Sequence, residues 1–236
     1  MTSDQLFQYI SADELLQRLQ KNLEPLVVFQ HATLAQREIL RETEILQPRT
    51  SVTFIANQEV YTSADAGWSF LKGLVRLVGG VNSDGRLISV RDEDWVLQAR
   101  RDAILRGLTN PVPPLCAFHI LSDPISLGFY GTPTTATTAT LTYVRGAGDA
   151  DDISDSVNPI VPDQWRDILI MGTKYQLIKS EAFKEIRAVG QGKMYENFLA
   201  ALTSFAQEYA MLKESARRVR TSLSADTSTM SKRFRI

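Results

Sequence analysis

The chain has few of the residues on which catalytic and metal sites depend. Among its 236 residues there is one cysteine, Cys116, and there are two histidines, His31 and His119. A single cysteine excludes an intrachain disulfide and favours folding in a reducing cytosol. The histidines lie far apart and neither has a neighbour at zinc-ligand spacing, so the sequence does not indicate a zinc site. We interpret Cys116 as a small core residue and His31 as a structural histidine.

A strong charge bias and a long apolar run are also missing. The chain has 26 lysines and arginines against 27 acidic residues, so its net charge of −1 gives no overall attraction to nucleic acid or to a membrane surface. No apolar run approaches the roughly 18 residues that a membrane-spanning helix needs. The first residues, "MTSDQLFQYI", do not have the pattern of a signal peptide. We therefore expect folding in the cytoplasm and no membrane partner.

Motifs of nucleotide-binding and hydrolytic sites are absent as well. The stretch "AVGQGKM" is similar to a phosphate-binding loop, but Arg187 stands where the first glycine is required, and no strand precedes it. The fragment "RGAGDAD" is followed by no predicted helix, and there is no nucleophile elbow. The sequence therefore predicts no enzyme activity and no cofactor.

Helices are predicted at both ends of the chain. Ser11, with Glu14 three residues later, has the pattern of a capping box at a helix start. Pro25 suits the first turn of a second helix. Two further helices are predicted over residues 163–189 and 194–220, and in the last of these the apolar residues recur at spacings of three and four.

Between these helices the pattern is that of short strands. Residues 82–85 form a good hairpin turn, and a short helix is predicted to begin near Asp92 or Asp94. The threonine-rich stretch 132–140 leads into a strand, because threonine favours strands. Such segregation predicts an α+β fold, in which terminal helices form a helical bundle beside a central antiparallel β region. The predicted parts are the first helices (1–48), the β region (49–148), an acidic loop with a helical hairpin (149–220), and an extended C-terminal tail (221–236).

Aspartates are concentrated before the penultimate helix, at positions 149, 151, 152, 155 and 163. Alternating carboxylates can bind calcium, but the mid-loop glycine and closing glutamate of an EF-hand are missing. A solvated loop is the simplest interpretation, and contact with basic residues of another subunit is a second. A small ligand- or metal-binding module, using the loop Asp149–Asp155 with Tyr130 or Tyr143, is the alternative from a different functional class.

The helix that follows the aspartates has very little polar surface. Its apolar residues, Trp165, Ile168, Leu169, Met171, Tyr175 and Ile178, occupy more than one face. More than one neighbour must therefore cover the helix, and Gly172 would let one of them approach closely. We expect part of the cover to come from an adjacent subunit. The predicted subunit interface comprises Asp151, Asp152, Asp155, Trp165 and Tyr175.

Basic residues gather at the C-terminus. Lysines and arginines stand at positions 213, 217, 218, 220, 232, 233 and 235, with Phe234 and Ile236 among the last of them. No aromatic residues alternate with the basic ones in the way that base stacking requires. Ordering such a tail costs about 1–2 kcal/mol per residue, so it would bind stably only as part of a larger assembly.

The order of these segments resembles the head-to-tail adaptor (connector) proteins of tailed bacteriophages. The matching segments are "TFIANQEVY" with Thr53, Tyr61 and the following Asp65, "LTNPVPPLCAFHI", "ISLGFYGTP", "ATLTYVRGAGDADDISD" and "IVPDQWRDILIMGTKYQLIK". The resemblance covers nearly the whole chain and depends on order and spacing. It departs from the family pattern in the threonine tract and at Ala66–Trp68.

The resemblance implies a structural role in the virion. It implies a homo-oligomeric ring of twelve subunits in the neck, beneath the portal protein, with a channel that passes DNA without reading its sequence. The next tail or neck protein would be a further partner. A portal-binding tail would then comprise Arg217, Arg218, Arg220, Lys232, Arg233, Phe234, Arg235 and Ile236. Another neck ring, a stopper or a tail-completion protein, is the structural alternative.

Overall fold

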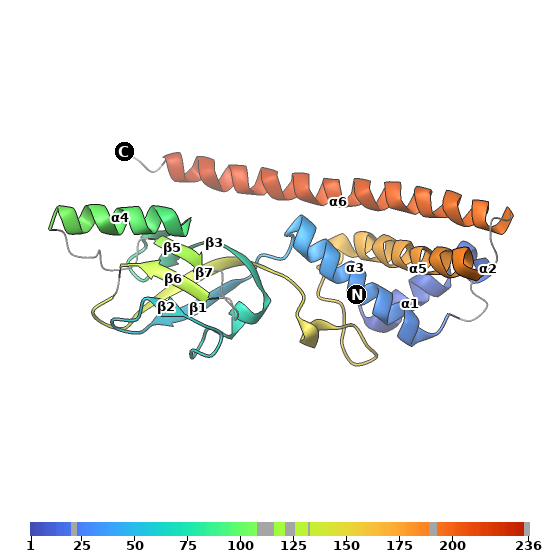
Figure 1. Cartoon of the computed structure of the whole chain (residues 1–236), viewed down its shortest axis with the longest axis horizontal. Helices are drawn as coiled ribbons and strands as arrows, with labels where there is room; N and C mark the ends of the chain where they lie inside the picture. Colours follow the sequence, from blue (N-terminus) through green and yellow to red (C-terminus); the bar gives the residue numbers. More distant parts are fainter. Residues whose placement is uncertain (20–22, 108–115, 121–125, 132, 189–192, 234–236) are drawn as a thin grey trace. The chain divides into compact units, whose positions relative to one another are not determined.

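The computed structural model describes residues 1–19, 23–107, 116–120, 126–131, 133–188 and 193–233. The chain forms two compact units, Met1–Leu46 with Ala147–Ile236 and Gln47–Gly146. We call the first the helical unit and the second the β unit (Figure 1). The α+β class predicted from the sequence is confirmed.

The helical unit contains α1 (Ser3–Ser11), α2 (Glu14–Leu19), α3 (Pro25–Thr43), α5 (Arg166–Ala188) and α6 (Lys193–Arg233). Thr2 and Gln5 form a capping box that begins α1. The capping box predicted at Ser11 is wrong, because the helix begun at Thr2 continues through Ser11 and ends there. Asp13 starts α2 instead, with its carboxylate accepting a hydrogen bond from the backbone N–H of Leu16.

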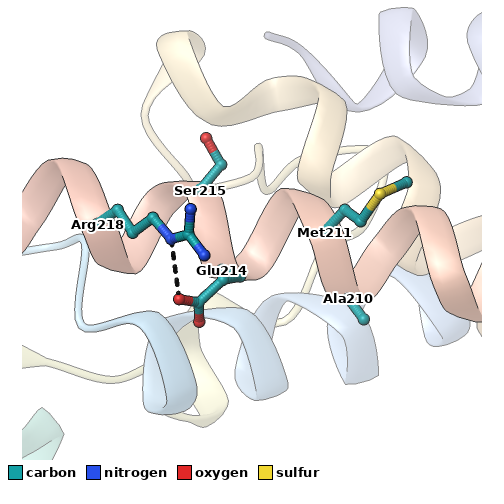
Figure 2. Close-up of a pocket in the computed structure, with 5 residues that line it drawn as sticks. All are labelled: Ala210, Met211, Glu214, Ser215 and Arg218. Carbon is teal, nitrogen blue, oxygen red and sulfur yellow. Dashed lines mark hydrogen bonds and ion pairs between the residues drawn. The ribbon is translucent and has the colours of Figure 1, made fainter.

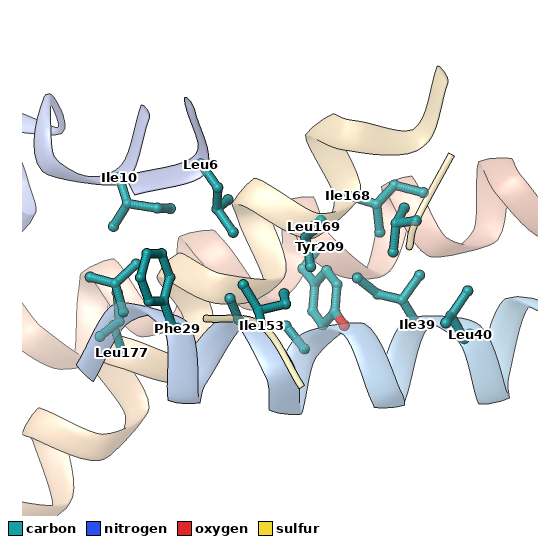
Figure 3. Packing of buried hydrophobic residues seen from close by; sticks show 14 of the residues in the cluster. Leu6, Ile10, Phe29, Ile39, Leu40, Ile153, Ile168, Leu169, Leu177 and Tyr209 are labelled. Atoms are coloured by element: carbon teal, nitrogen blue, oxygen red, sulfur yellow. The ribbon is translucent and has the colours of Figure 1, made fainter. Parts of the chain in front are cut away.

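These helices share one hydrophobic core (Figure 3). Leu6 of α1, Phe29 of α3, Leu169 of α5 and Tyr209 of α6 belong to it. Ile153, from the segment between the β unit and α5, is buried in the same core. The acidic loop is therefore anchored from within by an apolar side chain.

Helix α6 is longer than the sequence predicted. The extended tail expected from Thr221 is wrong for the residues that the structure describes, because α6 continues to Arg233. Residues 193–233 contain neither proline nor glycine. Without a helix breaker, the serines and threonines after Arg220 lower helix propensity only modestly and do not end the helix.

The β unit contains β1 (Arg49–Phe54), β2 (Val60–Tyr61), β3 (Leu74–Asn82), β4 (Leu87–Arg91), α4 (Glu93–Leu105), β5 (Cys116–Ile120), β6 (Ser126–Tyr130) and β7 (Thr137–Arg145). The strands form one sheet in the order β1-β7-β3-β4-β5-β6-β2. The prediction of an antiparallel region is wrong for one pair, since β4 and β5 are parallel. The cause is α4, which lies between them in the chain and forms the crossover that a parallel pair needs. Asp92 caps α4, as predicted.

The sheet curls around an aromatic core. Phe54, Tyr61, Trp68 and Phe129 are all buried, and the rings of Tyr61 and Trp68 are stacked with centroids 4.1 Å apart. Trp68 belongs to the segment Ala66–Trp68, where the sequence departs from the family pattern, and it is thus a core residue. The threonine tract becomes β7 from Thr137, with Ala139 and Leu141 in the core and Thr138 and Thr140 exposed. The expectation that its second half enters a strand is confirmed.

Candidate assembly surfaces

Helix α5 packs tightly against α6 of the same chain. A side-chain Cβ added at Gly172 would lie 2.9 Å from a ring carbon of Tyr209. That distance is shorter than van der Waals contact allows, so only glycine permits this approach. The close approach predicted at Gly172 is confirmed, and the neighbour is α6.

The aromatic residues predicted for the subunit interface contact their own chain. Trp165 and Tyr175 are partly buried against the core of the helical unit. The Tyr175 ring centroid lies 5.8 Å from that of Tyr209. A contact of these two residues with an adjacent subunit stays a prediction, and it could involve only the part of each side chain that remains exposed.

The acidic loop, residues 149–155, is held against α3 by Arg37. Its guanidinium donates hydrogen bonds to the carboxylates of Asp152, at 2.7 Å, and Asp149, at 2.9 Å. Asp151 instead accepts a hydrogen bond from the backbone N–H of Gly148 with its carboxylate, at 2.9 Å. Asp155 is exposed. Two of the four carboxylates in the loop are thus paired with a basic residue of the same chain.

Two further side chains of α3 hold the backbone on either side of the loop. Gln36 is fully buried, its amide nitrogen donates to the carbonyl of Asp151, and its amide oxygen accepts from the backbone N–H of Ile160. Thr33 accepts from the backbone N–H of Ile153 at 2.9 Å. The sequence reasoning missed these residues. The signal that the sequence offers for them is weak. Thr33, Gln36 and Arg37 are polar residues close together on α3, among the apolar residues that face the core.

A network of charged groups joins α6 to α3. The Lys213 ammonium lies 2.6 Å from a carboxylate oxygen of Glu38 and 3.0 Å from one of Glu42. Burial alone would lower the pKa of Lys213, but its hydrogen bonds to the two glutamates outweigh burial and raise it. Arg217 donates to the backbone carbonyl of Glu42 at 3.0 Å, near the end of α3.

The residues predicted for portal binding fall into two groups. Arg217 holds α3, and Arg218 donates to the carboxylate of Glu214 at 3.1 Å, so both contact their own chain. Arg220, Lys232 and Arg233 lie on α6, but their side chains are outside the described part of the structure. Residues 234–236, which include Phe234, Arg235 and Ile236, lie outside the described residues altogether.

A shallow hollow of about 450 Å³ opens beside α6 (Figure 2). The residues of α6 that line it are Ala210, Met211, Glu214, Ser215 and Arg218. Apart from the Arg218–Glu214 ion pair, these are small or apolar side chains. The Glu214 carboxylate accepts a hydrogen bond from Arg218, and we assign the hollow no chemistry.

The titratable residues of the β unit that the sequence singled out serve its packing. Cys116 is buried, and burial raises the pKa of its thiol, which makes it unreactive. The imidazole Nε2 of His119 accepts a hydrogen bond from the backbone N–H of Leu77 at 2.9 Å. Burial, followed by the charge of Arg76, lowers the pKa of His119. No group of three or more possible metal ligands occurs among the described residues.

Comparison with protein families identifies the class. The SU10 adaptor protein family matches residues 4–227, which is nearly the whole chain. The chain therefore belongs to the SU10 adaptor protein family. It is thus a bacteriophage adaptor, a structural protein of the virion that assembles with other virion components. No curated protein matches the chain. Within the described residues, no helix has the length and the apolar character that crossing a membrane would require.

Proposed function

We propose that the chain is the subunit of a ring, of twelve copies in the family it resembles, that sits beneath the portal and links the capsid to the tail. The ring leaves a central channel for DNA. The observation that carries this proposal is the family match over residues 4–227. The described residues offer no competing metal cluster, and the acidic loop is occupied by contacts with α3.

Helix α6 supports a more specific role for the C-terminus. Leu202, Phe205, Tyr209, Leu212 and Ala216 pack in the helical core at alternating spacings of three and four. The same spacing continues in the sequence through Val219 and Leu223, is interrupted by the charged Asp226, and returns to an apolar residue at Met230. Val219 is 43% exposed although it follows the core positions in this pattern. Residues 217–233 make about 25 Å of helix beyond the last core residue.

The portal-binding segment is therefore proposed to act as a helix and not as an extended tail. An apolar stripe at this spacing suits a groove between helices of the partner. The basic residues of the segment, Arg220, Lys232 and Arg233 within α6 and Arg235 beyond it, would contact acidic residues at the rim of that groove. The helical form also lowers the ordering cost, because fewer backbone torsions are fixed on binding.

Removal of Thr221–Ile236 tests the proposal. We expect the shortened chain to keep its unfolding midpoint, because the core of the described helix ends at Ala216, and to lose binding to the cognate portal in a pull-down assay. Leu223→Asp in the full-length chain should weaken portal binding at least tenfold. Normal portal binding by the shortened chain would contradict the proposed role of the segment. Binding to a tail component but never to portal would favour another neck ring.

A further inference from the structure

Within the described residues of the β unit, a helix lies over only part of the outer side of the curled sheet. Helix α4 packs through Val96 onto Cys116, Phe118 and Tyr130 of β5 and β6. The outer side of β1, β7, β3 and β4 carries exposed residues instead. In the part of the β unit that the structure describes, one half of the sheet is therefore covered by a helix and the other half, which we call the bare half, is not.

The bare half has an uncharged row of side chains across four strands. Ser51 of β1 lies opposite Thr140 of β7, Thr140 lies opposite Val81 of β3, and Val81 lies opposite Leu87 of β4. All four are exposed, with Val81 at 40% and Leu87 at 68%. Next to these residues along their strands, Val52, Ala139, Leu141 and Ile88 lie in the core and Asn82 is buried, so the row faces outward. We call this row the sheet face.

Helix α4 carries exposed apolar residues on the side that does not face the sheet. Its side toward the sheet is buried through Val96 and Ala103. Its other side exposes Leu97, Ile104 and Leu105, of which the last two are 77% and 78% exposed. These three residues, at i, i+7 and i+8, form one apolar stripe on the helix surface. We call them the α4 stripe.

We propose that the α4 stripe of one copy packs on the sheet face of the next copy, so that the β units form a head-to-tail contact between adjacent subunits. This proposal rests on the ring put forward under Proposed function. A closed ring needs two different, complementary surfaces on each subunit, and the β unit carries one of each kind. Packing of the α4 stripe on the sheet face would also give the bare half of the sheet a helix layer like the one that α4 provides over β5 and β6.

Size and charge fit a second copy as the occupant. The row spans about 14 Å across four strands, and Leu97 to Leu105 spans about 12 Å along α4. A strongly charged partner would lose hydration on an uncharged row without compensation. Arg101 lies between the residues of the α4 stripe on the helix surface. Its aliphatic stem can lie along the sheet face while its guanidinium reaches Asp84. Asp84 is exposed in the turn beside Val81 and Leu87.

The contact is too small to hold two free chains together. A stable interface buries about 800 Å² per partner from some 20–30 residues a side, and these two surfaces supply fewer. The contact would therefore form when copies are brought together, as on a portal template, and would add to contacts of the helical unit.

Cross-linking tests the pairing of the two surfaces. Leu105→Cys and Thr140→Cys chains are mixed with cognate portal and treated with a short bis-maleimide linker, while the buried Cys116 stays unreacted. We expect covalent dimers from the mixture, and none from either chain alone. A chain with both substitutions should give a ladder of higher oligomers. Leu26→Cys, at an exposed position of α3, replaces Leu105→Cys in the control mixture and should give no dimer.

Charge substitution gives an independent measurement on the same complexes. Ile104→Glu with Leu105→Glu should reduce the number of chains bound per portal at least fivefold, whereas Leu26→Glu should leave it unchanged. Full occupancy by the Ile104→Glu, Leu105→Glu chain, or dimers linked through identical positions, would overturn the proposed pairing and leave the portal-binding function intact. Failure of the unaltered chain to bind portal at all would instead overturn the proposed function, and with it this pairing.

Discussion

At Gly172 the backbone of α5 meets the ring of Tyr209 so closely that a methyl group would lie 2.9–3.1 Å from three of its atoms. In an isolated helix, Gly172→Ala would be favourable by about 1 kcal/mol. Here the overpacking should cost about 1–3 kcal/mol and outweigh that gain. We expect a lower free energy of unfolding in guanidinium chloride, followed by circular dichroism.

Gly148→Ala is the matched control for Gly172→Ala. The nearest atom to a Cβ at Gly148 is 3.7 Å away, which is ordinary contact, and its φ of −91° suits any residue. We expect this variant to unfold within about 0.5 kcal/mol of the original chain. If Gly172→Ala proved as stable as Gly148→Ala, the close contact of α5 with α6 would be wrong.

Burial of His119, followed by the charge of Arg76, makes the β unit sensitive to acid, and protonation of Nε2 would also remove its hydrogen bond from Leu77. The pKa of His119 is lowered in the folded chain, so the unfolded chain binds the proton more readily. The stability contributed by the neutral imidazole is complete above the unfolded pKa of about 6.5, and it is lost as the pH falls below that value. We expect the unfolding midpoint to fall between pH 8 and pH 5.5.

His119→Gln separates this effect from general acid sensitivity. A glutamine oxygen can accept the same hydrogen bond and does not titrate in this range. The decrease between pH 8 and pH 5.5 should therefore be smaller in the variant. An identical pH dependence in both proteins would show that His119 is not the group that titrates.

These two residues differ in how far the sequence revealed them. Gly172 stands alone in an apolar helix, and a small residue there already predicts a close neighbour. The role of His119 depends on a backbone N–H at an irregular part of β3, between the register shifts at Leu74/Arg76 and Leu77/Gly79. That irregularity arises from pairing with β7, far along the chain, and no local pattern indicates it.

At the scale of elements, the acidic loop can be tested for the intersubunit contact predicted from the sequence. Asp152 pairs with Arg37 inside the chain, while Asp155 is exposed. Asp155→Lys should leave the free energy of unfolding within about 0.5 kcal/mol of the original. If the loop contacts a neighbour, the same change should reduce the number of copies assembled on portal, measured by electron microscopy.

Asp152→Lys serves as the comparison for Asp155→Lys. It removes an exposed ion pair and places a like charge beside Arg37, at a cost to folding of about 1 kcal/mol. A loop that contacts no neighbour would show normal assembly with Asp155→Lys. In that case the aspartates serve only to hold the loop on α3.

Local patterns predicted most elements, and non-local pairing decided the rest. The turn at Asn82–Gly85, the cap at Asp92 and the strand in the threonine tract follow from residues close together in sequence. The parallel pairing of β4 with β5 does not, because the residues of α4 show neither which way the chain returns nor where β5 pairs. The sequence predicts an extended tail from Thr221, whereas α6 continues to Arg233 because residues 193–233 contain no helix breaker.

For the whole molecule, membership of the SU10 adaptor protein family accounts for a structural role. The portal-binding segment proposed above belongs to the helical unit, and the proposed contact between subunits belongs to the β unit. In the described part of α5, Ile168, Leu169, Leu177 and Ile178 are buried against the chain's own helices, and Met171 and Tyr175 are partly buried. Exposed apolar residues lie instead on α4 and on the sheet face of the β unit. We therefore expect the isolated chain to be a monomer or a weak oligomer, because the α4 stripe and the sheet face are each smaller than a stable interface requires.

Electron microscopy of the purified chain mixed with its cognate portal tests the central claim most directly. The account predicts a second ring stacked on the portal ring, with an open channel along the shared axis, and no ring in samples of the chain alone. Persistent absence of any complex, at concentrations at which both proteins remain folded, would contradict it.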